Sequence, residues 1–158
     1  MMSIASHIVT NMEPDVCYFV GPGTTMRCVM DLLGLSNTLL GVDAVLNKEL
    51  IGSDLNEADL LRLLDEMENR GIPVKVIVTV IGGQGYVFGR GNQQLSHRVL
   101  RRIGKENIII GATESKMIAL GGKPLLVDTG DTSVNEQLSG YVKVITSMNR
   151  QMVYRVAY

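Results

Sequence analysis

The chain has 158 residues, 46% of them apolar, and a net charge of −1, values that predict one globular domain spanning 1–158. The near-neutral net charge gives no electrostatic basis for nucleic acid or an anionic membrane as a partner. The absence of Trp and the 4% aromatic content argue against a stacking surface for single-stranded nucleic acid. No apolar run approaches the roughly 20 residues that span a bilayer, and the N-terminus has no charged-then-apolar signal pattern, so we expect a cytoplasmic protein.

Cysteines and histidines give no sign of a metal site. Cys17 and Cys28 lie in apolar patterns and are predicted to be buried, reduced thiols. His7 and His97 are isolated, and no pair has the spacing of metal ligands. The cysteines and histidines therefore predict no metal site.

The first third of the chain alternates helix-like and strand-like segments. Helical spacing of apolar residues predicts a helix over 3–13, and the apolar run 16–20 predicts a buried strand. Thr24 or Thr25 is placed to cap the next helix, which Gly34 is placed to end.

The middle of the chain repeats this alternation. A strand is expected over 38–45, and Asp54 with Glu57 resembles a capping box for a helix that ends at Gly71. The β-branched run 74–81 is typical of a strand covered on both faces.

The last part completes an α/β pattern. A glycine-rich loop over 82–92 leads to a helix capped by Ser96. Further strands are expected over 108–110 and 125–127, a helical turn over 135–138, and a strand pair over 141–145 and 152–156. Because strands alternate with helices, we predict a three-layer, Rossmann-like α/β domain with a mainly parallel sheet and a C-terminal strand pair.

The first candidate site is the run Gly21-Pro22-Gly23-Thr24-Thr25 between a strand and a helix. In α/β sheets ligands bind beyond the carboxyl ends of the strands, and a helix N-terminus there suits a phosphate. The glycines allow close approach of the backbone, and the hydroxyls can donate hydrogen bonds. The run is neither a Walker loop nor a Rossmann fingerprint, and its structural alternative is a tight turn with a threonine cap.

The second candidate is the loop Gly82-Gly83-Gln84-Gly85, which continues to Gly89-Arg90-Gly91-Asn92-Gln93-Gln94. Five glycines in ten residues cost backbone entropy on folding, which a purely connecting loop rarely requires. Arg90, Asn92 and Gln93 offer donors to an anionic or polar ligand. A mobile surface loop is the structural alternative.

Carboxylates and a lysine near strand ends are further candidates. Asp43, Asp128 and Asp131 are placed to bind a hydroxyl or a metal ion, or to act as a base, although the latter two can equally set a turn. Lys116 follows a buried strand and is placed to neutralise a phosphate, unless it is a solvated surface lysine. Asp43 and Lys116 are the predicted catalytic pair.

Four runs of the sequence together resemble the C-terminal half of ATP-NAD kinase-like proteins, the group that includes acetoin-catabolism protein X. They are VGPGTTMRCVMDLLGL, TLLGVDAV, VIGGQGYVFGRGNQQLSHRVLRRIG and PLLVDTGD. The resemblance extends from about Val16 to Val156. It implies a nucleotide or phosphorylated small molecule as ligand, with NAD, or ATP with magnesium, as the family's compounds.

The resemblance also implies a missing part. Kinases of this superfamily use a Gly-Gly-Asp-Gly run in an N-terminal domain for catalysis and for holding the phosphate donor. This chain has Gly82-Gly83-Gln84-Gly85 instead, and glutamine can neither act as a base nor supply a charged metal ligand. We therefore expect a separated, truncated or split-gene C-terminal portion that is not a complete kinase alone, with a separate N-terminal kinase domain chain as one candidate partner.

Two alternatives remain open at this stage. The order of glycine loops and polar residues also resembles the ribose-5-phosphate isomerase and glucosamine-6-phosphate deaminase fold, which implies Asp43 as a base and Lys116 on a sugar phosphate, although the isomerase's Asp-Gly-Ala-Asp-Glu block is absent. A ligand-free regulatory or assembly domain is the other alternative. The composition is compatible with a homo-oligomer and does not fix the oligomeric state.

Overall fold

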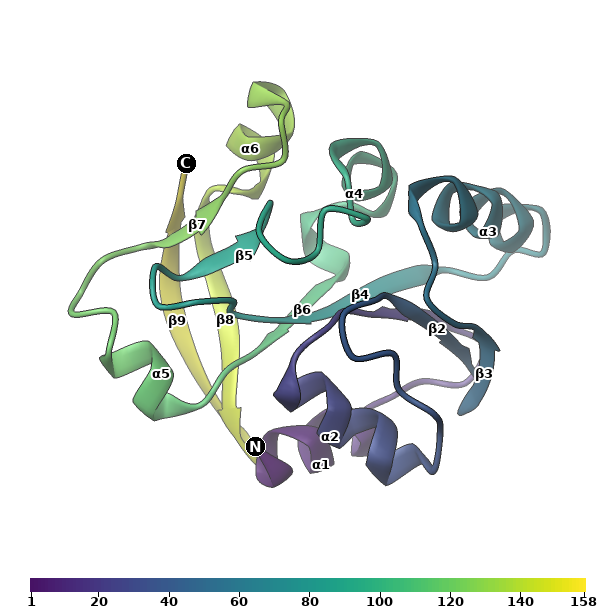
Figure 1. The fold of residues 1–158 in the computed structure, drawn as a ribbon, viewed down its shortest axis with the longest axis horizontal. Coiled ribbons are helices and arrows are strands. Elements are labelled where there is room, and N and C mark those ends of the chain that lie inside the picture. The colour runs from purple at the N-terminus through teal and green to yellow at the C-terminus, as the bar shows by residue number, and fades with distance from the viewer.

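The computed structural model describes every residue from 1 to 158 and shows a sheet between two layers of helices (Figure 1). The strands are β1 (Cys17–Val20), β2 (Asp43–Leu46), β3 (Glu49–Gly52), β4 (Val74–Thr79), β5 (Tyr86–Phe88), β6 (Ile108–Gly111), β7 (Leu125–Val127), β8 (Gly140–Ser147) and β9 (Arg150–Ala157). The helices are α1 (Met2–Thr10), α2 (Thr24–Leu33), α3 (Glu57–Asn69), α4 (His97–Ile103), α5 (Glu114–Ile118) and α6 (Thr132–Leu138), with a 3₁₀ turn over Lys105–Asn107.

All nine strands belong to one sheet, in the order β3-β2-β1-β4-β6-β8-β9-β7-β5. The pairs β1–β4, β4–β6, β6–β8, β7–β9 and β5–β7 are parallel, and the other three are antiparallel. The mainly parallel sheet and the C-terminal strand pair are thus confirmed. The pair β8–β9 lies inside the main sheet, because β8 bonds to β6 and β9 to β7.

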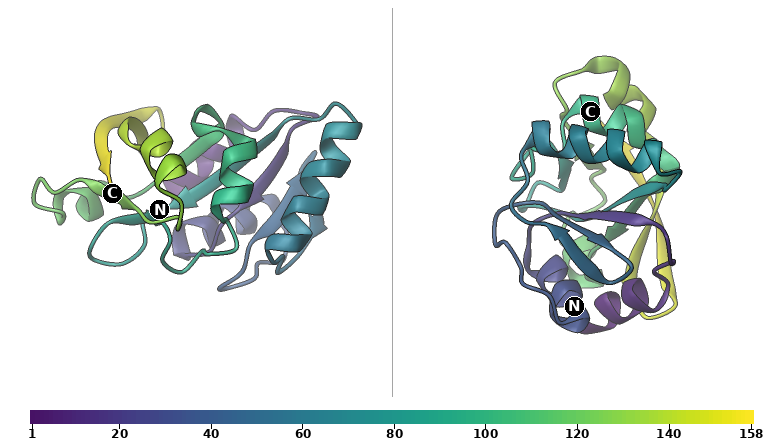
Figure 2. Two further views of the ribbon diagram at one scale, coloured as in Figure 1. Left: turned by 90° about the horizontal axis from the view of Figure 1, so that it is seen from above. Right: turned by 90° about the vertical axis from the view of Figure 1, so that its right-hand side faces the viewer.

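Both faces of the sheet are covered, which confirms the three layers (Figure 2). Successive residues of a strand point to opposite faces. In β1, Cys17 and Phe19 belong to the core shared with α3, α4 and α6, whereas Tyr18 and Val20 belong to the core shared with α1 and α2. This two-sided burial explains why the strands read as unbroken apolar runs. No helix is both long and apolar enough to cross a membrane.

Two predicted helix caps are wrong, for local reasons. Helix α2 is capped by Gly23 at φ 113, a backbone conformation that favours glycine, and no side chain caps it. Helix α3 begins after Asn56, whose side chain accepts from the Asp59 amide while Asp59 accepts from the Asn56 amide. The capping box is therefore two residues further along than the predicted one at Asp54.

Some elements differ from those expected. The segment predicted as a strand over 38–45 is a turn until Asp43, and β2 then forms a hairpin with β3 that the sequence pattern did not predict. The turn residues Asn47 and Lys48 both have positive φ, 51° and 64°, as a type I′ turn of a two-residue hairpin requires. This Asn-Lys pair lacks the usual glycine. Strand β5, which lies inside the glycine-rich segment, and the five-residue helix α5 were also not predicted.

Cys17 offers a test of the core. Its thiol is fully buried, and burial raises its pKa to about 12, an effect that Arg70 opposes and Glu66 reinforces. Cys28 is only half-buried, and neither cysteine forms a disulfide. In a Cys28→Ser variant at pH 8, we expect a thiol-specific reagent to label Cys17 only after unfolding in urea.

The raised pKa also predicts a pH dependence. Because the folded pKa exceeds the unfolded value of about 8.5, the Cys17 contribution to stability is fully present below that pH and is lost as pH rises toward 12. Cys17→Ala removes this titrating group. The unfolding free energy of the variant is therefore expected to fall less steeply with pH than that of the wild type over the same interval. Fast labelling of Cys17 in the native protein would show that β1 is not packed as described.

Candidate functional site

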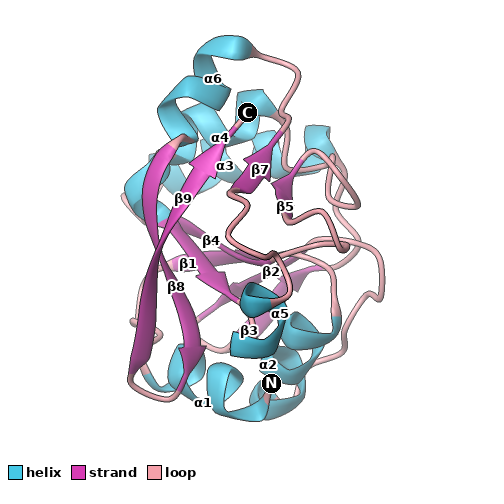
Figure 3. Cartoon of the chain, turned by 90° about the vertical axis from the view of Figure 1, so that its left-hand side faces the viewer, coloured by secondary structure: helices cyan, strands magenta, loops and turns pink.

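The candidate site lies where the carboxyl ends of β1, β4 and β6 meet. These strands are parallel neighbours, so the segments that follow them converge at one edge of the sheet. A cavity of about 290 Å³ opens there, which we call the threonine cavity; it is lined by Met1, Gly23, Thr24, Thr25, Thr79, Val80, Ile81, Gly82, Thr113 and Lys116. In Figure 3 α5 and α2 overlap in projection, and Figure 1 shows them on either side of the N-terminus, whose Met1 lines the cavity.

The first glycine loop lies directly on β4. A Cβ at Gly21 would lie 3.1 Å from the Val78 side chain, and one at Gly23 would lie 2.9 Å from the methyl carbon of Thr79. The first helical bond of α2 runs from the Arg27 amide to the Gly23 carbonyl. The preceding amides at the helix start consequently have no acceptor within the helix, and two of the residues that carry them, Thr24 and Thr25, line the threonine cavity.

Hydroxyl groups dominate the polar lining of the threonine cavity. Thr25 and Thr79 are 5% and 7% exposed, so their polar atoms are largely withdrawn from solvent. Since α2 uses no side-chain cap, the hydroxyls of Thr24 and Thr25 are not consumed by the helix start. Thr113 caps α5 by accepting from the Lys116 amide at 3.3 Å. The cavity thus collects hydroxyls from three separate segments.

Lys116 is the one side-chain cation of the threonine cavity. It is half-buried on α5, and it takes part in none of the eight ion pairs of the chain. No Asp, Glu or His lines the cavity. The resulting positive potential and hydrogen-bond donors suit an oxyanion such as a phosphate.

Asp43 lies near the threonine cavity without lining it. It pairs with Val20 at the end of β1 and is 1% exposed. Its carboxylate accepts from the Thr38 hydroxyl at 2.7 Å, the Thr38 amide at 3.0 Å and the Asp54 amide at 2.9 Å. These bonds fix the turn before β2 and the segment before α3, so in the structure both carboxylate oxygens of Asp43 are already occupied.

The second glycine loop divides between two places. Gly82 lines the threonine cavity, whereas Gly83 and Gln84 line a separate cavity of about 400 Å³ together with Leu120 and Lys123. Gly85, with φ 84, packs against Leu120 and lines neither. The loop therefore does not close as one unit over the threonine cavity.

The later part of this loop is held by its own side chains. Asn92 is fully buried, donates to the Val87 carbonyl at 2.8 Å and accepts from the Gly89 amide at 3.3 Å. The Arg90 guanidinium lies 4.6 Å from the centre of the Tyr86 ring, and Gln93 is exposed. Arg90, Asn92 and Gln93 do not line the threonine cavity.

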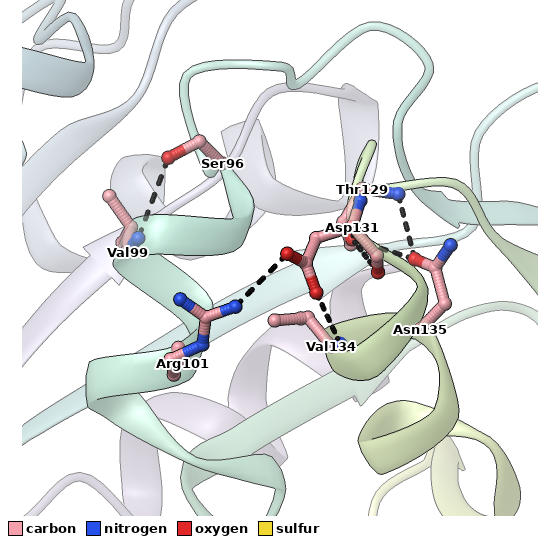
Figure 4. A network of polar contacts seen from close by, with 7 residues as sticks. All are labelled: Ser96, Val99, Arg101, Thr129, Asp131, Val134 and Asn135. Carbon is pink, nitrogen blue, oxygen red and sulfur yellow. Dashed lines mark hydrogen bonds and ion pairs between the residues drawn. The ribbon is translucent and has the colours of Figure 1, made fainter.

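Asp131 forms part of a polar network between α4 and α6 (Figure 4). It caps α6 by accepting from the Val134 amide at 3.0 Å and pairs with Arg101 at 3.1 Å. The Val134 hydrogen bond lowers the pKa of Asp131; partial desolvation opposes this effect and Arg101 reinforces it. Asp128, at the end of β7, is exposed. Neither carboxylate lines the threonine cavity.

The prediction from sequence missed Thr79 and Thr113. Thr79 is the last residue of β4, and Thr113 lies two residues after the end of β6. The rule that ligands bind beyond strand ends applies to every neighbouring parallel strand, so polar residues at these two positions carried the same signal as the glycine loop.

The comparisons with known proteins agree with the resemblance noted in the sequence. No curated protein and no solved structure matches the chain. A family model described as the ATP-NAD kinase C-terminal domain matches residues 13–156, which include five of the six helices and all strands except the last residue of β9. The chain therefore belongs to the ATP-NAD kinase C-terminal domain family.

Proposed function

We propose that this chain is the nucleotide- or phosphate-binding C-terminal module of an ATP-NAD kinase-like protein and that the threonine cavity holds a phosphate of the ligand. The observation that carries the proposal is the convergence of Gly23–Thr25, Thr79, Thr113 and Lys116 at one sheet edge. Family membership supports a nucleotide as the ligand class.

The lining of the cavity favours binding over chemistry. Hydroxyls, helix-start amides and one ammonium group stabilise an anion, whereas no carboxylate or imidazole lines the cavity to act as a base. Asp43 is engaged by three donors. In this proposal Lys116 binds phosphate, and Asp43 supports the fold beside the cavity. The complete enzyme phosphorylates NAD to NADP, and a separate N-terminal domain supplies the remaining catalytic groups.

Binding experiments test the proposal. We expect the purified chain to gain thermal stability with NAD, NADP or magnesium–ATP. A ligand at about 100 times its Kd adds roughly 2.7 kcal/mol, which corresponds to about 5–10 °C for a domain of this size. Because a hydrogen bond to a charged group contributes about 1.5–3 kcal/mol, Lys116→Ala is expected to weaken binding about 10- to 100-fold, as measured by titration calorimetry.

Lys143→Ala is the matched control, since Lys143 is an exposed lysine on β8 with no ion pair. Thr24→Ala combined with Thr25→Ala should weaken binding as well. A response to ribose 5-phosphate alone, with turnover, would favour the isomerase alternative. If none of the compounds raised the thermal unfolding midpoint of the wild-type chain or of Lys116→Ala, a ligand-free assembly domain would be favoured.

A further inference from the structure

The separate cavity of about 400 Å³ lies directly beside the threonine cavity. In the second glycine loop, Gly82 lines the threonine cavity and the next residue, Gly83, lines the separate one. On α5, Lys116 lines the threonine cavity, and Ala119, the residue that ends this helix, lines the separate one. Three helical residues rise about 4.5 Å. One peptide unit of the loop and less than one turn of α5 therefore divide the two cavities.

The two cavities differ in the chemistry of their walls. Hydroxyls dominate the polar lining of the threonine cavity, whereas the separate cavity has no Ser, Thr, Asp, Glu or His. Its walls combine four apolar side chains with two polar ones, those of Ala119, Leu120, Pro124, Leu126, Gln84 and Lys123. Apolar walls with a few polar groups are typical of a site that holds the ring of a small molecule.

The two polar side chains fit the edge of a purine base. The Gln84 amide both donates and accepts, and glutamine uses these two groups together in its bidentate contact with adenine. Lys123 only donates, which suits a ring nitrogen. The backbone of Lys123 is fixed, because its amide donates to the Leu120 carbonyl at 3.1 Å and its carbonyl accepts from the Tyr154 hydroxyl at 2.6 Å. Its ammonium group takes part in no ion pair of the chain.

Gly83 leaves an open path from one cavity to the other. Gly83 is exposed, and neither there nor at Gly82 would a Cβ meet any atom within 4 Å. Gly83 also has no positive φ, so neither packing nor backbone conformation requires a glycine at this position. A ligand that crosses the Gly82–Gly83 peptide accounts for the missing side chain, because only glycine lets a ligand approach the backbone so closely.

We propose that the separate cavity holds the adenine base of the nucleotide whose phosphate lies in the threonine cavity, with the ribose across the Gly82–Gly83 peptide. This inference rests on the proposed function and narrows its ligand to an adenine nucleotide. The arrangement matches that of a nucleotide, in which one sugar ring separates the phosphate from the base.

Calorimetry of the purified chain with AMP and with ribose 5-phosphate, which lacks the base, tests the inference. A bidentate contact to a base discriminates about 10- to 100-fold, so we expect AMP to bind the wild type at least about 30-fold more tightly. Ala119→Trp places a large side chain in the separate cavity. It should weaken AMP binding about 30-fold and leave the affinity for ribose 5-phosphate within about threefold of the wild type.

Ile118→Trp is the matched control, because Ile118 is the neighbouring residue, is 68% exposed and lines neither cavity. It should leave both affinities unchanged. Since Ala119 is exposed too, the thermal unfolding midpoint of Ala119→Trp should stay near that of the wild type. Gly83→Val places a side chain on the path of the ribose and should weaken AMP binding at least about 10-fold without loss of stability.

Four outcomes overturn the inference. They are equal affinities of the wild type for the two compounds, an equal loss of both in Ala119→Trp, the same loss of AMP in Ile118→Trp, and full AMP affinity in Gly83→Val. Failure of the proposed function has a different signature: the wild type would bind neither compound, or Lys116→Ala would bind ribose 5-phosphate as tightly as the wild type does.

Discussion

Replacing Asp43 by alanine is expected to lower the free energy of unfolding by about 3–5 kcal/mol, because it leaves buried donors without an acceptor. The amides of Thr38 and Asp54 and the Thr38 hydroxyl all donate to this carboxylate. Urea denaturation at pH 7 measures the change.

Two further variants show whether the acceptor role accounts for the loss. Asp43→Asn keeps one oxygen but presents an amino group to at least one donor, so about 1–3 kcal/mol should be lost. Thr38→Ala removes only the hydroxyl donor and should cost less than Asp43→Ala. If Asp43→Ala kept full stability but abolished turnover of a sugar phosphate, Asp43 would be a base and not a support.

Gly89→Ala is expected to destabilise the chain by about 3 kcal/mol or more. Gly89 has φ 97, which strains any L-residue by about 1–2 kcal/mol. A Cβ there would overlap the Asp128 carbonyl oxygen and lie 2.9 Å from the Asp128 Cβ, so the backbone between β5 and β7 has to move, at a further cost of about 1–3 kcal/mol. The midpoint and slope of urea unfolding measure the loss.

Gly130→Ala is the control for this prediction. Gly130 has φ 83, and no atom lies within 4 Å of the position that an alanine Cβ would take, so only the backbone strain applies. Equal losses at Gly89 and Gly130 would mean that the close contact between Gly89 and Asp128 is absent in solution. A larger loss at Gly89 would confirm that this contact joins the second glycine loop to the end of β7.

Local signals in the sequence predicted much of the fold. Gly34 ends α2 in the left-handed conformation, Ser96 caps α4, and the run 125–127 is β7. Each of these depends on a few neighbouring residues. The antiparallel hairpin of β2 and β3, by contrast, depends on a turn at Asn47 and Lys48 that lacks the usual glycine. The strand order depends on contacts between distant segments.

The candidate site was predictable only in part. The first glycine loop and Lys116 were identified separately, and the structure places them around one cavity although about 90 residues separate them. The second loop was predicted as one candidate site, but Gly82 lines the threonine cavity whereas Gly83 and Gln84 line the separate cavity. Asp43 was identified as a carboxylate near a strand end, and its hydrogen bonds with Thr38 and Asp54 are what assign it to the turn before β2.

The most direct test of the central claim is an amide NMR titration of the isotopically labelled chain with NAD. We predict that the largest shifts occur at Thr24, Thr25 and Gly82 and around Lys116, and that the Lys116→Ala variant loses them at the same concentrations. Shifts confined to Gln84 and the other residues of the separate cavity, or shifts that Lys116→Ala leaves unchanged, would contradict the assignment of the threonine cavity as the phosphate site.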